Sequence, residues 1–282
     1  NGNYELSAQS PLLGMGTPVG APADDLNGNP RPNPEGSNPD IGAYESPYSE
    51  RIPAVFYIAT DGDDSSIGDS LNPFLTIQRG INAASDDDSV IVDTGTYTEG
   101  INLQGKGIVL GSKFLTTGNT SYISNTIING VVNFQTTEDS NTVFKGFTIE
   151  NASGRGLDIS GSSPTISDLI VQNCTSGGIY IYSSDLTLQD ITVQNNTKSN
   201  GNGAGIQIQN GSNVTLKNCN ILNNTVLNYG GGGIYIYNSY VEIDSCLIDG
   251  NIADGHGGNI YFIEDNYANL RIVNSIIKNG FT

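Results

Sequence analysis

Residues 168–195 read DLIVQNCTSGGIYIYSSDLTLQDITVQN and contain one full period of a repeat. The opening segment, DLIVQNC, returns as DITVQNN from Asp190, and related segments start at Gly146, Asn218, Ser245 and Asn274. Successive segments start 22 to 29 residues apart, and in each an apolar or small second residue and a β-branched fourth residue alternate with other residues. That alternation predicts a half-buried strand in every period.

The sixth residue of the segment is Asn in every copy except one, which has Gly250. Asn tolerates the left-handed backbone of a tight bend, so we expect a turn at this position. Identical side chains that stack on one another can also hydrogen-bond along the stack. We therefore expect the sixth-position amides to form a ladder.

Two further strands are predicted in each period. One has the pattern GIYIY, as from Gly178 and Gly233, and the other has the pattern LTLQ from Leu186 or VTLK from Val214. Three short strands per period predict an all-β fold, a right-handed parallel β-helix, whose coils stack about 4.8 Å apart. The β-α-β alternative needs helix-period segments between the strands and a leucine-rich repeat needs LxxLxLxxN; neither pattern is present.

A capping helix is predicted ahead of the solenoid, because bare sheet ends need cover. Four apolar residues fall at spacings of 3, 4 and 3, the pattern of one helix face: Phe74, Ile77, Ile81 and Ala84. Asn72 or Ser70 is the expected N-cap.

Composition divides the chain into three parts. Residues 1–45 are rich in Pro, Gly, Asn and Asp and have little periodicity, 46–55 reads as a linker, and 56–282 is the β-helix. No capping pattern follows Ile277, so we expect the β-helix to be incomplete at its C-terminal side.

Charge and apolar content exclude several classes of partner. The chain has 11 Lys and Arg against 29 Asp and Glu, a formal net charge of −18. It has no basic stripe of the kind that a nucleic-acid binder needs, and no stretch approaches the roughly 18 apolar residues of a membrane span. The three cysteines, Cys174, Cys219 and Cys246, fall inside the repeats, so we expect buried thiols, with Cys219 and Cys246 stacked and unpaired.

From Phe56 to Asn279 the chain resembles the pectin-lyase-like superfamily of right-handed β-helix proteins. The resemblance is carried by Tyr57-Ile-Ala-Thr-Asp-Gly-Asp-Asp64, by Asn72-Pro-Phe-Leu-Thr-Ile-Gln78 and by Gly95-Thr-Tyr-Thr-Glu99. Separately, Ser10-Pro-Leu-Leu-Gly-Met-Gly16 and Asp40-Ile-Gly-Ala-Tyr-Glu45 resemble the end of a choice-of-anchor Q domain. Together they imply a bacterial protein, secreted or at the cell surface, built from tandem β-helix modules. Its expected partners are neighbouring modules in cis or identical subunits in a head-to-tail fibre.

In enzymes of this superfamily the active groove usually runs along one parallel sheet, so the outward residues of the GIYIY strands are the ones to inspect. These outward side chains are an aromatic and amide platform suited to surface polysaccharide: Tyr180, Tyr182, Gln207, Gln209, Tyr235, Tyr237 and Tyr261. Cross-strand stacking for sheet stability is the alternative reading.

Catalysis has little support on the same face. A glycosidase needs two carboxylates, and a polysaccharide lyase needs a base, often Arg or Lys, usually with Ca²⁺. The outward positions supply one carboxylate, Asp158, and no Lys or Arg, so no catalytic residue is assigned. We expect a structural or adhesive surface protein, with a polysaccharide lyase, a glycoside hydrolase or a carbohydrate-binding module as the alternative.

Two further motifs are weaker candidates. The carboxylates Asp61, Asp63, Asp64 and Asp69 could chelate Ca²⁺, which prefers several oxygen ligands, although a solvated turn explains them as well. Gly255-His256-Gly257 matches a tripeptide of polygalacturonase-type hydrolases, but the motifs that accompany it there are missing, so His256 is expected in a turn.

Overall fold

The computed structural model describes residues 5–48, 50–263 and 268–282. They form two compact units, Asn1–Ala54 and Val55–Thr282. The predicted linker, 46–55, belongs to the first unit as far as Ala54, since Ser46 is buried and its backbone N–H donates to Asp40. Within the described residues, no helix has the length and apolar character needed to cross a membrane.

The first unit is held together by buried carboxylates. Asp25 accepts hydrogen bonds from three backbone N–H groups and Asp40 from two. Glu45 is buried and ion-paired with Arg31 at 2.7 Å. A segment rich in Pro and Gly leaves many backbone N–H groups without sheet or helix partners, and these side chains satisfy some of them.

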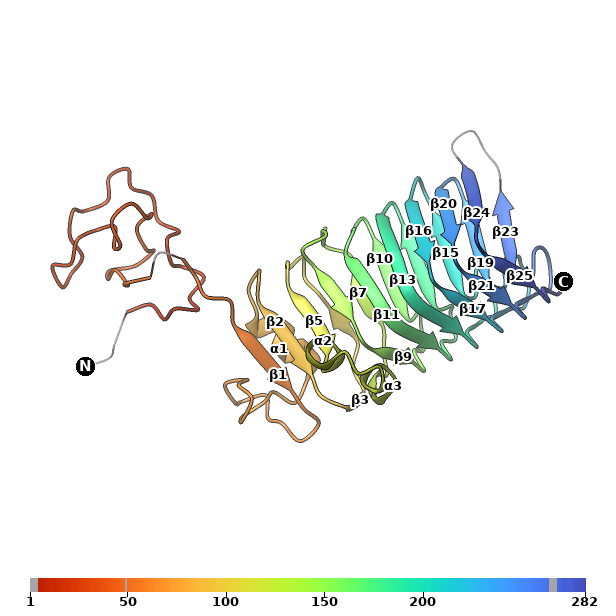
Figure 1. Cartoon of the computed structure of the whole chain (residues 1–282), viewed down its shortest axis with the longest axis horizontal. Coiled ribbons are helices and arrows are strands. Elements are labelled where there is room, and N and C mark those ends of the chain that lie inside the picture. The colour runs from red at the N-terminus through yellow and green to blue at the C-terminus, as the bar shows by residue number, and fades with distance from the viewer. Residues whose placement is uncertain (1–4, 49, 264–267) are drawn as a thin grey trace. The chain divides into compact units, whose positions relative to one another are not determined.

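The second unit is a right-handed parallel β-helix, which confirms the predicted fold class (Figure 1). Its longest run of paired strands among the described residues contains nine members: β1 (Val55–Ile58), β2 (Ser89–Val92), β5 (Val109–Ser112), β8 (Val143–Lys145), β11 (Thr165–Gln172), β13 (Asp185–Gln194), β16 (Asn213–Lys217), β20 (Tyr240–Asp244) and β24 (Asn269–Val273).

The same sheet turns a corner and continues as a second face. That face contains the ends of β11 and β13 together with β3 (Gly95–Tyr97), β6 (Thr126–Ile128), β9 (Thr148–Glu150), β17 (Asn220–Leu222), β21 (Leu247–Asp249) and β25 (Ile276–Lys278). Three two-residue strands form a small sheet at the next corner: β14 (Thr197–Lys198), β18 (Thr225–Val226) and β22 (Ile252–Ala253). Short helices α2 (Phe114–Thr117) and α3 (Ser121–Asn125) lie beside the early coils (Figure 1).

The GIYIY segments make a separate sheet, here called the platform sheet, which closes each coil. Its strands among the described residues are β4 (Ile101–Asn102), β7 (Val132–Phe134), β10 (Leu157–Ser160), β12 (Ile179–Tyr182), β15 (Ile206–Gln209), β19 (Ile234–Tyr237) and β23 (Ile260–Ile263). Every pairing in this sheet is parallel and joins equivalent residues of successive coils.

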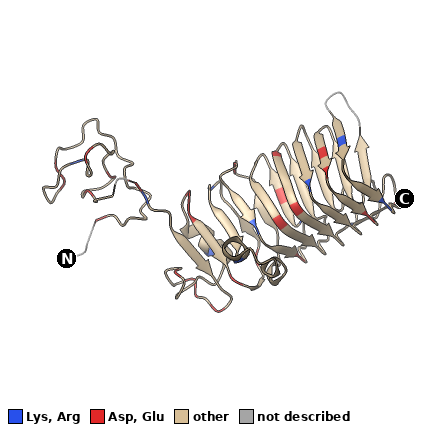
Figure 2. Cartoon of the chain, in the orientation of Figure 1, with Lys and Arg blue, Asp and Glu red and all other residues tan. Residues whose placement is uncertain are grey.

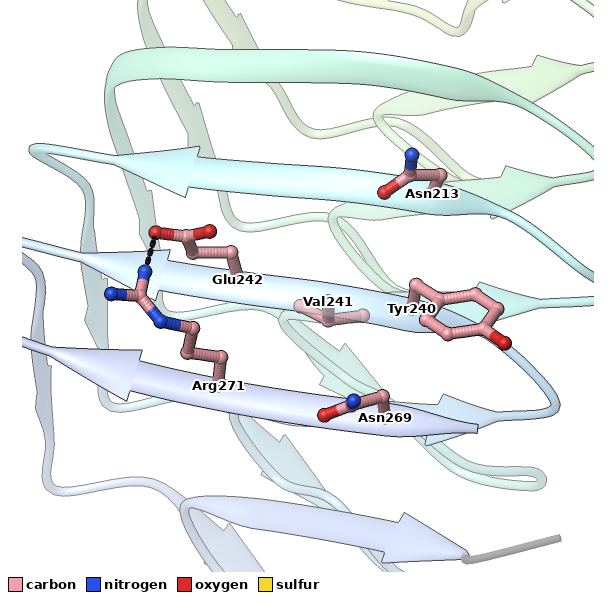
Figure 3. A pocket seen from close by; sticks show the side chains of 6 residues that line it. All are labelled: Asn213, Tyr240, Val241, Glu242, Asn269 and Arg271. Atoms are coloured by element: carbon pink, nitrogen blue, oxygen red, sulfur yellow. Dashed lines mark hydrogen bonds and ion pairs between the residues drawn. The ribbon is translucent and has the colours of Figure 1, made fainter. Parts of the chain in front are cut away.

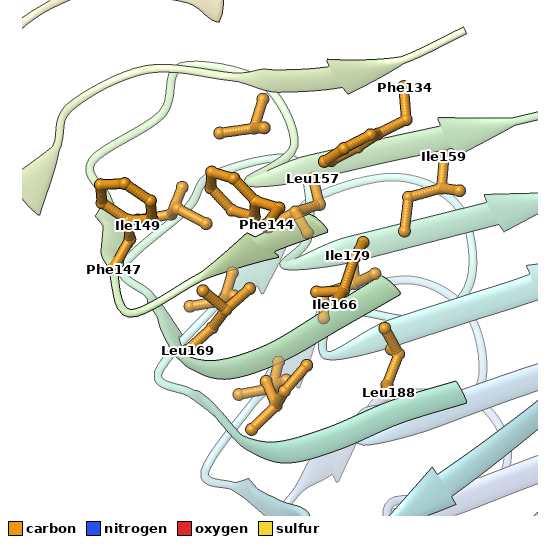
Figure 4. Close-up of a cluster of buried hydrophobic side chains, with 14 of the residues drawn as sticks. Phe134, Phe144, Phe147, Ile149, Leu157, Ile159, Ile166, Leu169, Ile179 and Leu188 are labelled. Atoms are coloured by element: carbon orange, nitrogen blue, oxygen red, sulfur yellow. The ribbon is translucent and has the colours of Figure 1, made fainter. Parts of the chain in front are cut away.

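Inward side chains of the strands stack into one continuous core. Ile159, Ile181, Ile208 and Ile236 occupy the same position in four successive coils and are fully buried. Each such side chain stabilises the fold by about 1.5–3 kcal/mol relative to an exposed one. In the earlier coils Phe134, Phe144 and Phe147 fill the same interior (Figure 4), with ring centroids 5.7 and 4.9 Å apart.

The corner at the sixth residue of the repeat is left-handed, as predicted: φ is +56° at Asn195 and +53° at Asn223. The predicted amide ladder at this position is wrong by one residue, because Asn195 and Asn223 are exposed. The bend turns the following side chain inward, and it is Asn196, Asn224 and Asn251 that are fully buried. Their amides hydrogen-bond from coil to coil at 2.9 Å.

The other two corners are built on the same plan. Ser184 accepts the backbone N–H of Ser162 in the preceding coil, and Cys219 donates its own N–H to the Cys246 sulfur at 3.4 Å. All three cysteines, Cys174 included, are buried and free, which confirms the expected interior, unpaired thiols. A small polar side chain at each corner thus satisfies a backbone N–H that the bend removes from the sheet.

The capping helix is present as α1 (Ile77–Ala83). The predicted N-cap was wrong: the hydroxyl of Thr76, and neither Asn72 nor Ser70, accepts the N–H of the residue three positions later. Phe74 lies before the first residue of the helix and is buried against the first coil. The predicted apolar helix face therefore began too early, because its first residue belongs to the segment that leads into α1.

Candidate functional site

The outward side chains of the platform sheet form two columns. The register aligns Asp158, Tyr180, Gln207, Tyr235 and Tyr261 in the first. The second column, one pleat away, contains Ser160, Tyr182, Gln209, Tyr237 and Ile263. All seven residues predicted for glycan contact therefore lie on one face, because alternation along each strand sends the neighbouring Ile side chains into the core.

The seven predicted side chains differ in exposure. Tyr182 and Tyr237 are the most open, with 40% and 42% of their surface exposed. Tyr180, Gln207, Gln209 and Tyr261 are half-buried. Tyr235 departs from the expectation, since it is only 5% exposed with the Tyr261 ring 5.7 Å away, and burial raises its pKa. Tyr235 therefore supports Tyr261 and presents little surface to a ligand.

A cation flanks the start of the columns. Arg155, in the turn before β10, forms an ion pair with Asp158 at 2.6 Å. Its guanidinium carbon also lies 3.5 Å from the centroid of the Tyr180 ring, which in turn stacks with Tyr182 at 6.1 Å. Stacking on Arg and on a second ring holds Tyr180 in place, which lowers the entropy that a ligand would have to remove.

A second cation reaches the face from the following turn. The Lys198 ammonium, on β14, donates to the Asn202 carbonyl at 2.8 Å and to Oε1 of Gln207 at 2.5 Å. Burial, together with the nearby charge of Arg155, lowers the pKa of Lys198 to about 8. Loss of hydration penalises the charged form of an amine, so Lys198 has an unusually accessible neutral form.

The outward strand positions carry no Lys or Arg, as predicted, but Arg155 and Lys198 reach the same face from residues outside the platform strands. Reasoning from the strand positions alone missed both side chains. Neither residue carries a signal in the alternation pattern, because turn residues follow no period. Lys and Arg are scarce in the chain as a whole (Figure 2), with 11 against 29 Asp and Glu.

His256 lies at the far end of the same face, in the Gly-rich bend before β23. Its ring is 5.3 Å from that of Tyr261, and its carbonyl accepts the N–H of Gly231 at 2.8 Å. The expected turn position is therefore correct, and the histidine packs on the platform.

Among the described residues, the titratable groups on this face besides the tyrosines are the carboxylate of Asp158, the cations Arg155 and Lys198, and His256 at the far end. Asp158 is the one carboxylate of the two columns and is already paired with Arg155. A glycosidase needs a pair of carboxylates about 5 to 9.5 Å apart, which these columns lack. Lys198, whose pKa is lowered to about 8, is a titratable amine beside the first column.

The calcium candidates do not fit a metal site. Asp64 uses both oxygens to accept from Thr76 and the backbone around it, while Asp63 and Asp69 each accept N–H groups within their own turns. Across the described residues, no three His, Cys, Asp or Glu side chains come together as metal ligands. These carboxylates order the turns that lead into α1.

Comparison with known proteins bears on the fold. Several solved structures are similar at low identity. A pectin methylesterase from carrot has a TM-score of 0.42 and 11% identity over 80% of this chain and 87% of its own. ORF18 of Geobacillus virus E2 has a TM-score of 0.39 and 13% identity over 79% and 61%. A rhamnogalacturonan lyase has a TM-score of 0.35 and 12% identity over 80% and 87%.

No curated protein matches the sequence. The resemblance of residues 1–45 to a choice-of-anchor Q domain is not tested by these comparisons and stays a prediction. The family model described as a right-handed beta helix region matches residues 129–282. That segment is more than half of the chain and contains the coils with the most regular repeat, so the chain belongs to the right-handed β-helix family.

Proposed function

We propose that this chain is a structural or adhesive extracellular protein whose platform sheet binds polysaccharide. The observation that carries the proposal is the pair of outward columns, in which exposed Tyr182 and Tyr237 stand beside the amides of Gln207 and Gln209. Tyr rings offer apolar faces to sugar rings, and amides both donate to and accept from hydroxyl groups. A glycan lying along the solenoid would meet a new coil about every 4.8 Å.

The two flanking cations extend this proposal to acidic glycans. Arg155 keeps guanidinium donors beyond the one that binds Asp158, and the ammonium of Lys198 lies beside Gln207. Guanidinium groups favour bidentate contact with carboxylates. A glycan that carries uronate groups would therefore bind at the Arg155 end of the platform and neutral sugars would stack on Tyr237.

The proposal places the protein outside a bacterial cell, with other β-helix modules or identical subunits as neighbours. Its support is the acidic composition, with a formal net charge of −18, and the resemblance of residues 1–45 and 56–279 to parts of tandem β-helix modules.

Binding tests the proposal directly. The full chain would be applied to an array of bacterial and plant polysaccharides, and hits would be followed by calorimetry. Tyr182→Ala should weaken binding about tenfold, since stacking on one ring contributes about 1–2 kcal/mol. Tyr48→Ala removes a ring of equal exposure from the first unit and serves as the control. Equal affinities for both variants, or the absence of any hit, would refute a glycan-binding platform.

A polysaccharide lyase is the second candidate, favoured by the lowered pKa of Lys198. In such a reaction a neutral amine removes the proton at C5 of a uronate and a C4–C5 double bond forms. The C4–O bond to the next sugar breaks, and its oxygen leaves with the electron pair and takes up a proton from water. A base works best with a pKa near the operating pH. Release of ultraviolet-absorbing products from polygalacturonate by the wild type and not by Lys198→Ala would establish this reaction.

A further inference from the structure

The outer face of β16, β20 and β24 carries a shallow depression on a different sheet from the platform. Its volume is about 230 Å³. Six of the described residues line it (Figure 3): Asn213, Tyr240, Val241, Glu242, Asn269 and Arg271. Pockets that enclose drug-sized ligands measure roughly 300–1,000 Å³, so this depression has room for one ring of a larger ligand.

The strand register fixes how these side chains are arranged. Tyr240 lies between Asn213 and Asn269 in one column, so the two amides flank the ring from strands that are about 10 Å apart. Glu242 and Arg271 are partners in the next outward column, and Figure 3 shows Arg271 reaching from β24 to form an ion pair with Glu242 on β20.

The ring and the two amides are available to a ligand. Tyr240 is 48% exposed, whereas Tyr235 on the platform sheet is 5% exposed. Within the described part of the chain, Tyr240 stacks on no other ring and its hydroxyl has no hydrogen bond. The side-chain amides of Asn213 and Asn269 likewise make no hydrogen bond to another described residue. The inward neighbour Val241 fills the core at this point, and the Tyr240 ring lies on the outer face.

The combination of groups selects one ligand chemistry. An open ring face with amides on both sides and an ion pair at one edge matches a sugar, which has an apolar C–H face and a rim of hydroxyl groups. Glu242 neutralises Arg271, so the depression offers no net positive charge to an anion. A peptide strand would add along the edge of β24, which has no further partner among the described strands, whereas the groups of the depression project from the face of the three strands.

We propose that this depression binds one neutral sugar residue of a glycan. The sugar ring stacks on Tyr240, its hydroxyl groups bond to Asn213 and Asn269, and the Glu242–Arg271 pair contacts the hydroxyls at one edge. None of these side chains belongs to the platform sheet. The two proposals therefore rest on separate residues, and either can fail while the other stands.

Aromatic NMR of the full chain with ¹³C-labelled tyrosine separates the two sites. The probes are cellohexaose, xylohexaose, mannohexaose and hexagalacturonate. The Tyr240 signals are identified by their loss in Tyr240→Phe, and those of Tyr182 by their loss in Tyr182→Phe. We expect at least one neutral probe to shift the Tyr240 signals in a saturable manner, whether or not the Tyr182 signals move.

Calorimetry then measures the site in a Tyr182→Ala background. We expect Tyr240→Ala to weaken the responding probe about tenfold and Tyr240→Phe to keep its affinity within about twofold, because stacking needs the ring and not the hydroxyl. Equal thermal midpoints would show that all variants are folded. Tyr240 signals that respond to none of the four probes, or an unchanged affinity in Tyr240→Ala, would overturn the proposal.

Discussion

The buried amide ladder gives the sharpest prediction about stability. Asn224→Ala removes four hydrogen bonds of the side chain. Its Nδ2 donates to the Val193 carbonyl at 3.0 Å and to Oδ1 of Asn251 at 2.9 Å. Its Oδ1 accepts the backbone N–H of Asn196 at 3.0 Å and the side-chain Nδ2 of Asn196 at 2.9 Å.

The magnitude follows from this count. A hydrogen bond contributes about 1 kcal/mol net, and a buried group left without its partner costs about 1–3 kcal/mol. Four lost bonds, with the Asn196 N–H left unpaired in the interior, give a destabilisation of roughly 4 to 6 kcal/mol. With a urea m-value of about 3 kcal/mol/M, the unfolding midpoint should fall by more than about 1 M.

Urea unfolding followed by far-ultraviolet circular dichroism measures this change, and hydrogen exchange locates it. Coils interact with their nearest neighbours, so amide protection should fall most around β13, β17 and β21. The matched control is Asn223→Gly, one residue earlier, where the side chain is exposed, φ is +53° and the next coil already has Gly250. A loss of stability within about 1 kcal/mol of that control would refute the ladder's role.

Three other predictions concern titratable groups. Lys198 loses its charge as pH rises through its pKa of about 8. Hexagalacturonate should therefore bind the wild type more weakly at pH 9 than at pH 7, whereas Lys198→Ala should show no such change. Burial raises the pKa of Cys174 to about 11, so its thiol should resist iodoacetamide in the folded protein. After denaturation, mass spectrometry should find three alkylated cysteines, and two cysteines that resist alkylation would contradict free thiols. Burial alone would raise the pKa of Asp25, but hydrogen bonds from Glu45 and Asn29 lower it overall. The stability that Asp25 contributes is therefore present above about pH 4 and is lost progressively as pH falls through the lowered pKa of the folded state. Pepsin should cleave the first unit faster at pH 2 than at pH 4, and equal resistance at the two values would argue against this.

The strands could be predicted from sequence because their geometry leaves little choice. Once Ile179 and Ile181 face the core, Tyr180 and Tyr182 must face outward, and parallel stacking then aligns them with Gln207 and Gln209. The platform columns follow from this alternation alone.

The bends and turns were harder to predict. Alternation alone would turn Asn195 inward, in step with Val193, and the ladder was assigned to it for that reason. The left-handed bend at Asn195, which was predicted, reverses the alternation, so Asn195 is exposed and Asn196 is buried. Arg155 and Lys198 were missed because the path of a turn depends on its length and on the coil below. The exposure of Tyr235 could not be read from the pattern either, since the Tyr261 ring 5.7 Å away belongs to the next coil.

Coil length in this solenoid varies mainly at one corner. Six positions separate Asn173 from Ile179, and eleven separate Asn195 from Ile206 and Asn223 from Ile234. The corner between the two faces of the large sheet keeps a constant length across the same coils. The variable corner is the one that carries Arg155, Lys198 and the Gly-rich bends onto the platform. Insertions and deletions there would remodel the rim of the platform while leaving every core side chain in place, which makes this corner the natural place to graft loops when the scaffold is engineered toward new ligands.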